Sequence, residues 1–242
     1  MIKRGWFITG TDTGIGKTTF SSILLRSLNQ QGCRAVGLKP IASGVIKNAR
    51  EWVNQDALIL QKASAGKPSI KIINPICFEP AIAPHIAAGQ QGVKLTVAKV
   101  LKHCRTALNQ NADAVVIEGA GGLLVPLNRQ ETMLDLIKAF GFPAIVVVGL
   151  KLGCLNHAIL TLQVLKQHQV PVAGWVANMI DPTMSAFEEN IETLSQYFLQ
   201  PPMAVLPHQV QQSKLEASLL MKLLSDFKPA RYRQNHSALY QN

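Results

Sequence analysis

A glycine-rich turn near the N-terminus is the feature of this 242-residue sequence that most restricts its fold. Residues 10–18 read GTDTGIGKT, with an apolar run before them and a helical pattern that begins at Lys17. Glycines between a strand and a helix free backbone N–H groups to surround phosphate oxygens, and a lysine followed by a threonine supplies a cation and a hydroxyl. The segment therefore predicts a phosphate-binding P-loop, although Thr11 holds the usual first glycine position and Gly10 stands one residue earlier.

Apolar runs and helical patterns alternate along the rest of the chain. This alternation implies right-handed crossovers and a parallel β-sheet with helices on both faces. We therefore predict a single-domain α/β P-loop NTPase fold over residues 1–227 and a mobile C-terminal tail over 228–242. Strands are expected at residues 6–9, 35–38, 114–117, 144–148, 172–177 and 204–206. Helices are expected at residues 17–31, 56–63, 97–108, 132–139, 156–166, 184–198 and 215–224.

Composition narrows the class of protein further. Hydrophobic residues make up 48% of the chain and aromatic residues 6%, which favours an aliphatic core around buried parallel strands. The most apolar stretch, residues 142–150, is too short to span a bilayer, and the start MIKRGWF lacks the apolar segment of a signal peptide. Four cysteines lie far apart without metal-site spacing, so we expect them to be reduced. These features predict a soluble cytoplasmic protein with no membrane partner.

The formal net charge of +10 raises the question of a nucleic-acid partner. The lysines and arginines are scattered along the chain, without the runs and interleaved aromatic residues of a nucleic-acid surface. We therefore expect anionic small molecules as partners and no nucleic acid.

Charged residues follow two of the predicted strands. Lys39 comes directly after residues 35–38 and leads into a proline turn that contains Ser43. A lysine at the end of a buried strand is costly unless it faces an anion or an ion-pair partner, while an isolated one can extend its ammonium group into solvent. Glu118 follows residues 114–117 and precedes the run GAGG. A carboxylate in that position of a P-loop protein is placed to hold Mg²⁺ directly or through water.

Two helix starts can be interpreted in two ways. Asp56, in the segment NQDAL, can favour the N-terminus of its helix or approach a metal ion. In the segment KLGCLNH, residues 151–157, Asn156 can cap a helix, or the helix N-terminus can bind a carboxylate group.

The last two predicted strands also end in polar residues. Asn178 begins an Asn-x-x-Asp pattern, but Met179 occupies the place of the lysine that guanine-binding proteins have there. Guanine specificity is therefore not expected. Pro207 and His208 follow the last strand, where they can line a base pocket or form an ordinary turn.

Assembled in order, these segments resemble the dethiobiotin synthetase family, whose members catalyse the penultimate step of biotin synthesis. The resemblance extends over roughly the first 210 residues, and a threonine at the first glycine position of the P-loop is typical of that family. The matching segments are GTDTGIGKT (10–18), LKPIASG (38–44), NQDAL (54–58), NPICFEP (74–80), PHI (84–86), VIEGAGG (116–122), KLGCLNHA (151–158) and AGWVAN (173–178).

The resemblance implies an ATP- and Mg²⁺-dependent ligase. One amine of 7,8-diaminononanoate takes up CO₂ as a carbamate, and the γ-phosphoryl group of ATP is transferred to that carbamate. The second amine then closes the ureido ring, giving dethiobiotin, ADP and phosphate. The resemblance also implies a homodimer, in which residues 152–156 of one subunit bind the substrate carboxylate in the site of the other.

The resemblance assigns roles to individual residues. Lys17 and Lys39 are expected to act on the transferred phosphoryl group, and Ser43 to lie near the carbamate. The expected Mg²⁺ ligands are Thr18, Asp56 and Glu118. The expected nucleotide contacts are Gly14, Ile15, Gly16, Lys17, Thr18, Thr19, Asp56, Glu118, Gly119, Ala120, Gly121, Asn178, Pro207 and His208. The expected substrate contacts are Thr13, Lys39, Ser43, Gly121, Val125, Leu152, Gly153 and Asn156.

Two other classes of protein compete with this interpretation. A DNA-binding partition ATPase would suit the positive charge, but that class carries an additional lysine near the start of the P-loop, where this chain has Thr11, Asp12 and Thr13. A related amide-forming synthetase normally carries a glutaminase domain, and no further domain fits within this chain. After Pro207 the family often places an acidic residue near the ribose, whereas this chain reads QVQQSK, so its ribose contacts are not assigned.

Overall fold

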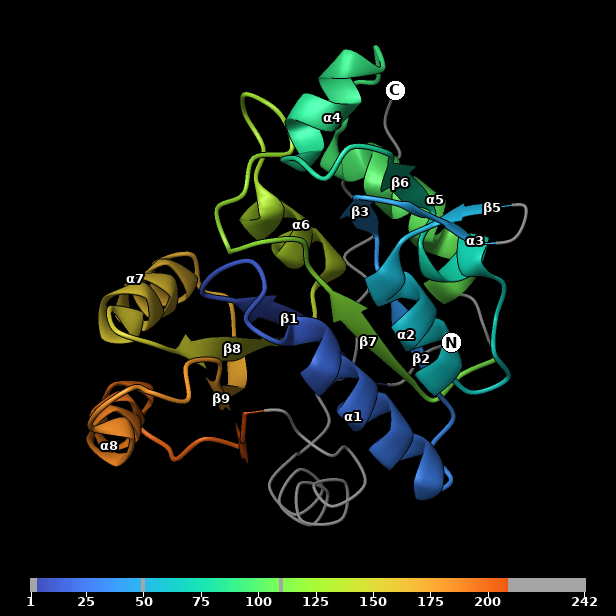
Figure 1. The fold of residues 1–242 in the computed structure, drawn as a ribbon. Helices are drawn as coiled ribbons and strands as arrows, with labels where there is room; N and C mark the ends of the chain where they lie inside the picture. Colours follow the sequence, from blue (N-terminus) through green and yellow to red (C-terminus); the bar gives the residue numbers. More distant parts are fainter. Residues whose placement is uncertain (1–3, 49–50, 109–110, 209–242) are drawn as a thin grey trace.

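The structure, a computed structural model, describes residues 4–48, 51–108 and 111–208. Its centre is a six-stranded sheet with the strand order β10-β9-β8-β1-β7-β2, in which all neighbouring strands are parallel (Figure 1). This arrangement confirms the predicted α/β fold. The strands are β1 (Arg4–Gly10), β2 (Ala35–Leu38), β7 (Ala114–Glu118), β8 (Ala144–Leu150), β9 (Val172–Met179) and β10 (Ala204–Leu206).

Helices cover both faces of this sheet, because side chains alternate between its two sides. In β1, Phe7 packs in the cluster that contains residues of α5, α6, α7 and α8, whereas Ile8 packs in the cluster that contains residues of α1, α2 and α3. The helices are α1 (Lys17–Gln30), α2 (Gln55–Ala63), α3 (Ile70–Ile73), α4 (Pro84–Gln90), α5 (Val97–Leu108), α6 (Met133–Phe140), α7 (Cys154–Gln167) and α8 (Phe187–Phe198). None of the helices in the described ranges is both long and apolar enough to cross a membrane.

The predicted elements within the described residues are present, with boundaries that differ by at most three residues. The sequence patterns did not predict two short strand pairs, β3 (Ile41–Ser43) with β6 (Ile76–Phe78) and β4 (Ile46–Asn48) with β5 (Glu51–Val53). They also did not predict α3 and α4. Elements of three to seven residues are too short to show a hydrophobic period. The predicted helix at 215–224 and the tail at 228–242 lie outside the described residues.

The order of the strands determines where a ligand can bind. β1 lies between β7 and β8, and its chain leads directly through the P-loop into α1. After β7 the chain crosses to β8, on the far side of β1, whereas β2 lies on the other side of β7. The direction in which strands are added therefore reverses beside β1, where the carboxyl ends of β1, β2 and β7 lie at the same edge of the sheet. Ligands of parallel α/β sheets bind at such a position.

Candidate active site

Two glycines of the P-loop adopt a left-handed backbone conformation. The φ angles of Gly14 and Gly16 are 72° and 92°. Residues that carry a side chain are strained in this left-handed region, and glycine is not. A side chain at Gly16 would also collide with the carboxamide of Asn178, which donates from Nδ2 to the carbonyl oxygen of Ile15 at 2.8 Å. The end of β9 therefore holds the P-loop in place.

Lys17 lies at the start of α1, and its ammonium group donates to the carbonyl oxygen of Asp12 at 2.6 Å. The residue is only 6% exposed. Burial, together with the positive charge of Lys39, lowers the pKa of Lys17 to about 8. A triphosphate beside this ammonium group would favour its charged form, because an opposite charge offsets the cost of burial.

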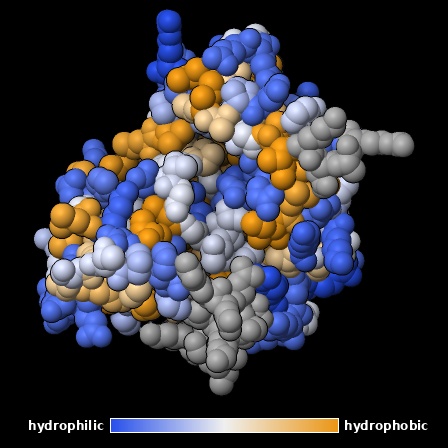
Figure 2. Space-filling view, in the orientation of Figure 1, coloured by the Kyte–Doolittle hydropathy of each residue, from blue (hydrophilic) through white to orange (hydrophobic). Residues whose placement is uncertain are grey.

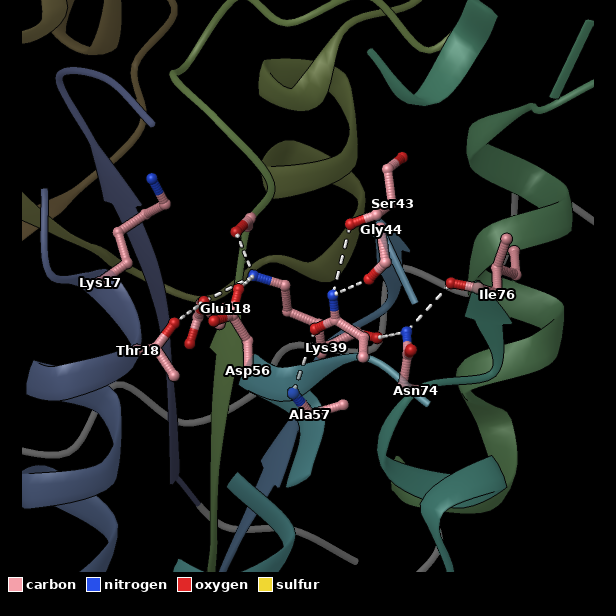
Figure 3. A network of polar contacts seen from close by, with 12 residues as sticks. Lys17, Thr18, Lys39, Ser43, Gly44, Asp56, Ala57, Asn74, Ile76 and Glu118 are labelled. Atoms are coloured by element: carbon pink, nitrogen blue, oxygen red, sulfur yellow. Dashed lines mark hydrogen bonds and ion pairs between the residues drawn. The ribbon is translucent and has the colours of Figure 1, made fainter. Parts of the chain in front are cut away.

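Lys39 is the centre of a cluster of charges, in which Lys39 and Glu118 are buried and Asp56 is partly exposed (Figure 3). Its Nζ donates to Glu118 Oε1 at 2.6 Å, to Asp56 Oδ2 at 3.0 Å and to the carbonyl oxygen of Gly119 at 3.3 Å. Burial alone would lower the pKa of Lys39, but the carboxylates of Glu118 and Asp56 outweigh this and raise it. Burial would likewise raise the pKa of Asp56, and the nearby Lys39 lowers it instead. Lys39 is therefore an ion-pair partner and not a solvent-directed lysine.

Two asparagines hold this cluster in position. Asn74 donates from Nδ2 to the carbonyl oxygen of Lys39 at 2.8 Å, which holds the backbone of the lysine. Asn54 accepts from the backbone N–H of Ala57 at 3.2 Å as the N-cap of α2, and donates to the carbonyl oxygen of Gly44 at 2.9 Å. The start of α2, which carries Asp56, is therefore held against the loop after β3.

The side chains of Thr18, Asp56 and Glu118 fit a magnesium ion. Thr18 Oγ1 donates to Glu118 Oε1 at 2.8 Å, so the hydroxyl and the carboxylate are adjacent. The other oxygen of Glu118, Oε2, is buried and has no hydrogen-bond partner among the described residues. Protein sites for Mg²⁺ typically use one or two carboxylates together with substrate phosphates, and these oxygens meet that description.

A cleft of about 680 Å³ joins these groups. One part of its wall is polar and contains the P-loop and the Lys39 cluster, while residues 81–84 and neighbouring aliphatic side chains form an apolar part. Figure 2 shows the surface hollowed on this face, with hydrophobic residues beside hydrophilic ones. The predicted site residues that line the cleft are Thr13, Gly14, Gly16, Lys17, Thr18, Thr19, Lys39, Ser43, Asp56, Glu118, Ala120, Gly121 and Val125.

The other predicted nucleotide contacts do not line this cleft. Ile15 is buried in the core, and Gly119 donates from its backbone N–H to Ile8 and accepts from Lys39. Asn178 contacts the P-loop backbone. Pro207 and His208 are exposed after β10, at the edge of the sheet. The base-binding role of these last three residues remains a prediction.

The predicted carboxylate-binding loop also lies outside the cleft of its own chain. Leu152 is 95% exposed, and Gly153 and Asn156 are exposed beside it. The N-cap of α7 is Gly153, with a φ angle of 92° and no side-chain cap hydrogen bond. The interpretation of Asn156 as the N-cap is therefore wrong, because the helix begins two residues earlier, at Cys154.

Sequence reasoning missed several residues of the site. The apolar part of the cleft contains Ile59 and Ile82, which come from α2 and from the loop before α4. Asp12 accepts from the backbone N–H of Thr13 at 2.7 Å and forms an ion pair with Lys151 at 3.5 Å, and so joins the P-loop to the exit of β8. The carboxylate of Asp12 was visible in the P-loop sequence, but the aliphatic residues carried no local signal.

Comparison with known proteins assigns the chain to a family. A family model described as an AAA domain matches residues 4–215. Proteins named ATP-dependent dethiobiotin synthetase from Aromatoleum aromaticum, Pseudoalteromonas translucida and Xylella fastidiosa are 42%, 41% and 45% identical to this chain. The matches cover 85%, 93% and 86% of this chain and 91%, 98% and 92% of those proteins. The chain belongs to the dethiobiotin synthetase family. The resemblance seen in the sequence is confirmed.

Solved structures show that the fold of this dethiobiotin synthetase family member is shared more widely. The cell division ATPase MinD of Pyrococcus furiosus aligns with a TM-score of 0.56 at 16% identity, over 93% of this chain and 99% of that one. A ParA family ATPase of Chlorobium tepidum aligns with a TM-score of 0.52 at 13% identity, over 93% and 91% of the two chains. At such low identity these similarities support the P-loop NTPase fold alone.

Proposed function

We propose that the protein is an ATP-dependent ligase that forms dethiobiotin from 7,8-diaminononanoate, CO₂ and ATP. The observation that carries this proposal is the pairing of Lys39 with Asp56 and Glu118 in the same cleft as Lys17 of the P-loop. A phosphoryl-transfer site needs cations and metal-binding carboxylates around the transferred group, and this cleft provides both. The names of the relatives supply the use of ATP and the product, dethiobiotin. The diamine substrate and the place of the reaction in biotin synthesis are those that the family resemblance implies.

The proposed reaction needs two bond-forming steps after the carbamate forms. A carbamate oxygen attacks the γ-phosphorus, and the bond between that phosphorus and the bridging β-phosphate oxygen breaks. ADP is the leaving group, and the product is a mixed carbamic–phosphoric anhydride. The second amine then attacks the carbonyl carbon, phosphate departs with the bonding electrons, and the ureido ring closes as the amine nitrogen loses a proton to the departing phosphate. Both partners of the first step are anions, so the positive charges of Lys17 and Lys39 lower its barrier. Mg²⁺ bound by Thr18, Asp56 and Glu118 would neutralise further phosphate charge.

The two kinds of wall in the cleft suit the two parts of this substrate. Ser43 Oγ is buried without a hydrogen-bond partner among the described residues, so its hydroxyl is available to a carbamate or amine. Ile59, Ile82 and Val125 belong to the apolar part, which suits the aliphatic chain of the diamine. The carboxylate of the substrate would then extend out of the cleft.

A homodimer would supply the contact for that carboxylate. Leu152, Gly153 and Asn156 are exposed and lie outside the cleft of their own chain, so they are available to a second copy. The backbone N–H groups at the start of α7 have the polarity that binds a carboxylate. In this proposal each active site is completed by the loop at the start of α7 of the other subunit.

Turnover tests the proposed function directly. ATP, bicarbonate, Mg²⁺ and 7,8-diaminononanoate are supplied together, and ADP and dethiobiotin are followed in the same reaction. We expect equal amounts of both products, and no ADP above background when the diamine is omitted. ADP release that does not depend on the diamine, with no dethiobiotin formed, would rule out the proposed function.

The two carboxylates are expected to govern the magnesium requirement. Glu118→Gln and Asp56→Asn each remove one anionic ligand and keep the shape of the side chain, so the Mg²⁺ concentration that gives half-maximal rate should rise. The measurement is a Mg²⁺ titration of turnover at saturating ATP. Glu192→Gln, an exposed change on α8, serves as the control and should leave the titration unchanged. An unchanged titration for Asp56→Asn would rule out Asp56 as a metal ligand and leave it as an ion-pair partner of Lys39.

Asn156→Ala is expected to act on substrate binding alone. Because Asn156 lies in the first turn of α7, within the segment assigned to the substrate carboxylate, its loss should raise KM for the diamine several-fold and leave KM for ATP nearly unchanged. Gln163→Ala, an exposed change further along α7, is the matched control. Steady-state kinetics with each substrate varied in turn measure both constants. Equal changes in the two KM values would refute the cross-subunit role.

A further inference from the structure

Lys39 has no hydrogen-bond donor left for a ligand in this arrangement. An ammonium group carries three N–H donors, and the three acceptors around Nζ are Glu118 Oε1, Asp56 Oδ2 and the carbonyl oxygen of Gly119. The residue is only 4% exposed, so water does not compete for these donors. To contact a phosphoryl or carbamate oxygen, the lysine must give up at least one of these bonds.

The two carboxylates that hold Lys39 are also the ones that fit the metal ion. Glu118 Oε1 accepts from both Lys39 and Thr18, and Glu118 Oε2 is buried beside them. A buried carboxylate needs a counter-charge, and Lys39 provides it here. Two cations within reach of the same two carboxylates repel each other, and Lys39 occupies lone pairs on Glu118 Oε1 and Asp56 Oδ2 that a metal ion would otherwise share.

The backbone around Lys39 allows its side chain to move while the chain stays in place. Its N–H donates to the carbonyl oxygen of Ile73 at 2.7 Å, and its carbonyl oxygen accepts from Asn74 at 2.8 Å. The stem of a lysine has four rotatable bonds, so the ammonium group can be redirected by side-chain rotation. The cleft that Lys39 lines also contains Ser43 and Thr13.

We propose that Lys39 and Mg²⁺ compete for the carboxylate pair of Asp56 and Glu118, so that metal binding releases the lysine to act on the transferred phosphoryl group. This inference rests on the proposed function, because it uses the same metal site and the same reaction. Competition is reciprocal, so the lysine must weaken metal binding as much as the metal weakens its hold on the carboxylates. An otherwise surprising result follows: loss of a lysine that assists the reaction should tighten metal binding.

The test measures metal binding without turnover. Mn²⁺ is titrated into the protein in the absence of nucleotide and followed by electron paramagnetic resonance, and the rise of the unfolding temperature with Mg²⁺ is measured in parallel. Lys39→Met and Lys39→Gln should bind Mn²⁺ on the order of tenfold more tightly than the unmodified chain, within the usual range of coupling between sites. Both variants should also gain more thermal stability from Mg²⁺. Should Lys39→Met fold poorly without metal, Lys39→Gln keeps a hydrogen-bond donor beside the carboxylates, and both measurements apply to it.

Lys17→Met is the matched control. Lys17 is a second buried lysine of the same cleft, but its ammonium group contacts the carbonyl oxygen of Asp12 and not the carboxylate pair. Its replacement should change Mn²⁺ affinity by much less than the replacement of Lys39. Equal tightening in both variants would mean a general effect of positive charge and would overturn the competition. Unchanged affinity in Lys39→Met, with turnover intact in the unmodified chain, would overturn the inference and leave the proposed function standing. No metal binding in any variant would overturn both the competition and the assigned metal site.

Discussion

Lys39→Ala is expected to bind ATP almost as well as the unmodified chain and to lose turnover on the order of 10²–10³-fold. Lys39 lines the cleft beside Ser43, on the side proposed for the carbamate. Charge spreads over the transferred phosphoryl oxygens and the carbamate oxygen only as the reaction proceeds. An ammonium group there stabilises the transition state more than the ground state, so its loss lowers kcat.

The measurement for Lys39 compares equilibrium binding of a non-hydrolysable ATP analogue with single-turnover rates. Saturating Mg²⁺ is used, so that differences in metal affinity between variants do not enter the comparison. Lys39→Gln should recover little activity, because a neutral amide supplies a dipole and not a charge. Lys71→Ala, an exposed change on α3, is the control and should keep both values. Wild-type single-turnover rates in Lys39→Ala would limit the lysine to a structural ion pair.

Lys17→Ala is expected to lose both ATP affinity and phosphoryl transfer. Lys17 follows Gly16 at the start of α1, in the position where a P-loop lysine reaches the β- and γ-phosphate oxygens. That contact is made before and during the reaction, so the loss should appear in the dissociation constant of the ATP analogue as well as in the single-turnover rate. Turnover should fall to the limit of detection.

The two lysines are therefore distinguished by the combination of two measurements, the affinity for the ATP analogue and the single-turnover rate. Lys17→Ala should weaken binding and abolish the reaction, whereas Lys39→Ala should spare binding. The same two measurements serve both variants, with Lys71→Ala as the shared control. Near-normal turnover in Lys17→Ala would remove the P-loop assignment, because no other described lysine lies at the start of α1.

The sheet and its principal helices could be predicted because their signals are local. Residues 144–148 form a continuous apolar run, and the structure extends that strand to Leu150. The helix from Lys17 follows directly from the glycines before it. Shorter elements escaped prediction for the opposite reason. β3 and β6 have three residues each and exist as a pair, formed between segments more than 30 residues apart in the chain.

The residues of the candidate site also differ in how far the sequence alone could place them. Glu118 could be placed at the end of β7 from its position after an apolar run, and the structure places it there. Asp56 could equally be a helix-cap carboxylate or a site residue, and only its contact of 3.0 Å with Lys39 showed that it belongs to the cluster. Asn156 shows the limit of local interpretation, because the glycine that starts α7 took the role expected of the asparagine.

The sequence by itself determined the strand–P-loop–helix unit, the parallel sheet and the family, because each is encoded in contiguous residues with a recognisable period or motif. Only the tertiary structure decided which polar groups meet. Lys39 and Glu118 are separated by 79 residues in the chain, yet they form a buried ion pair of 2.6 Å. That contact arises because β2 and β7 are parallel neighbours whose carboxyl ends lie at the same edge of the sheet. Strand order is set by packing across the whole domain, and no local pattern records it.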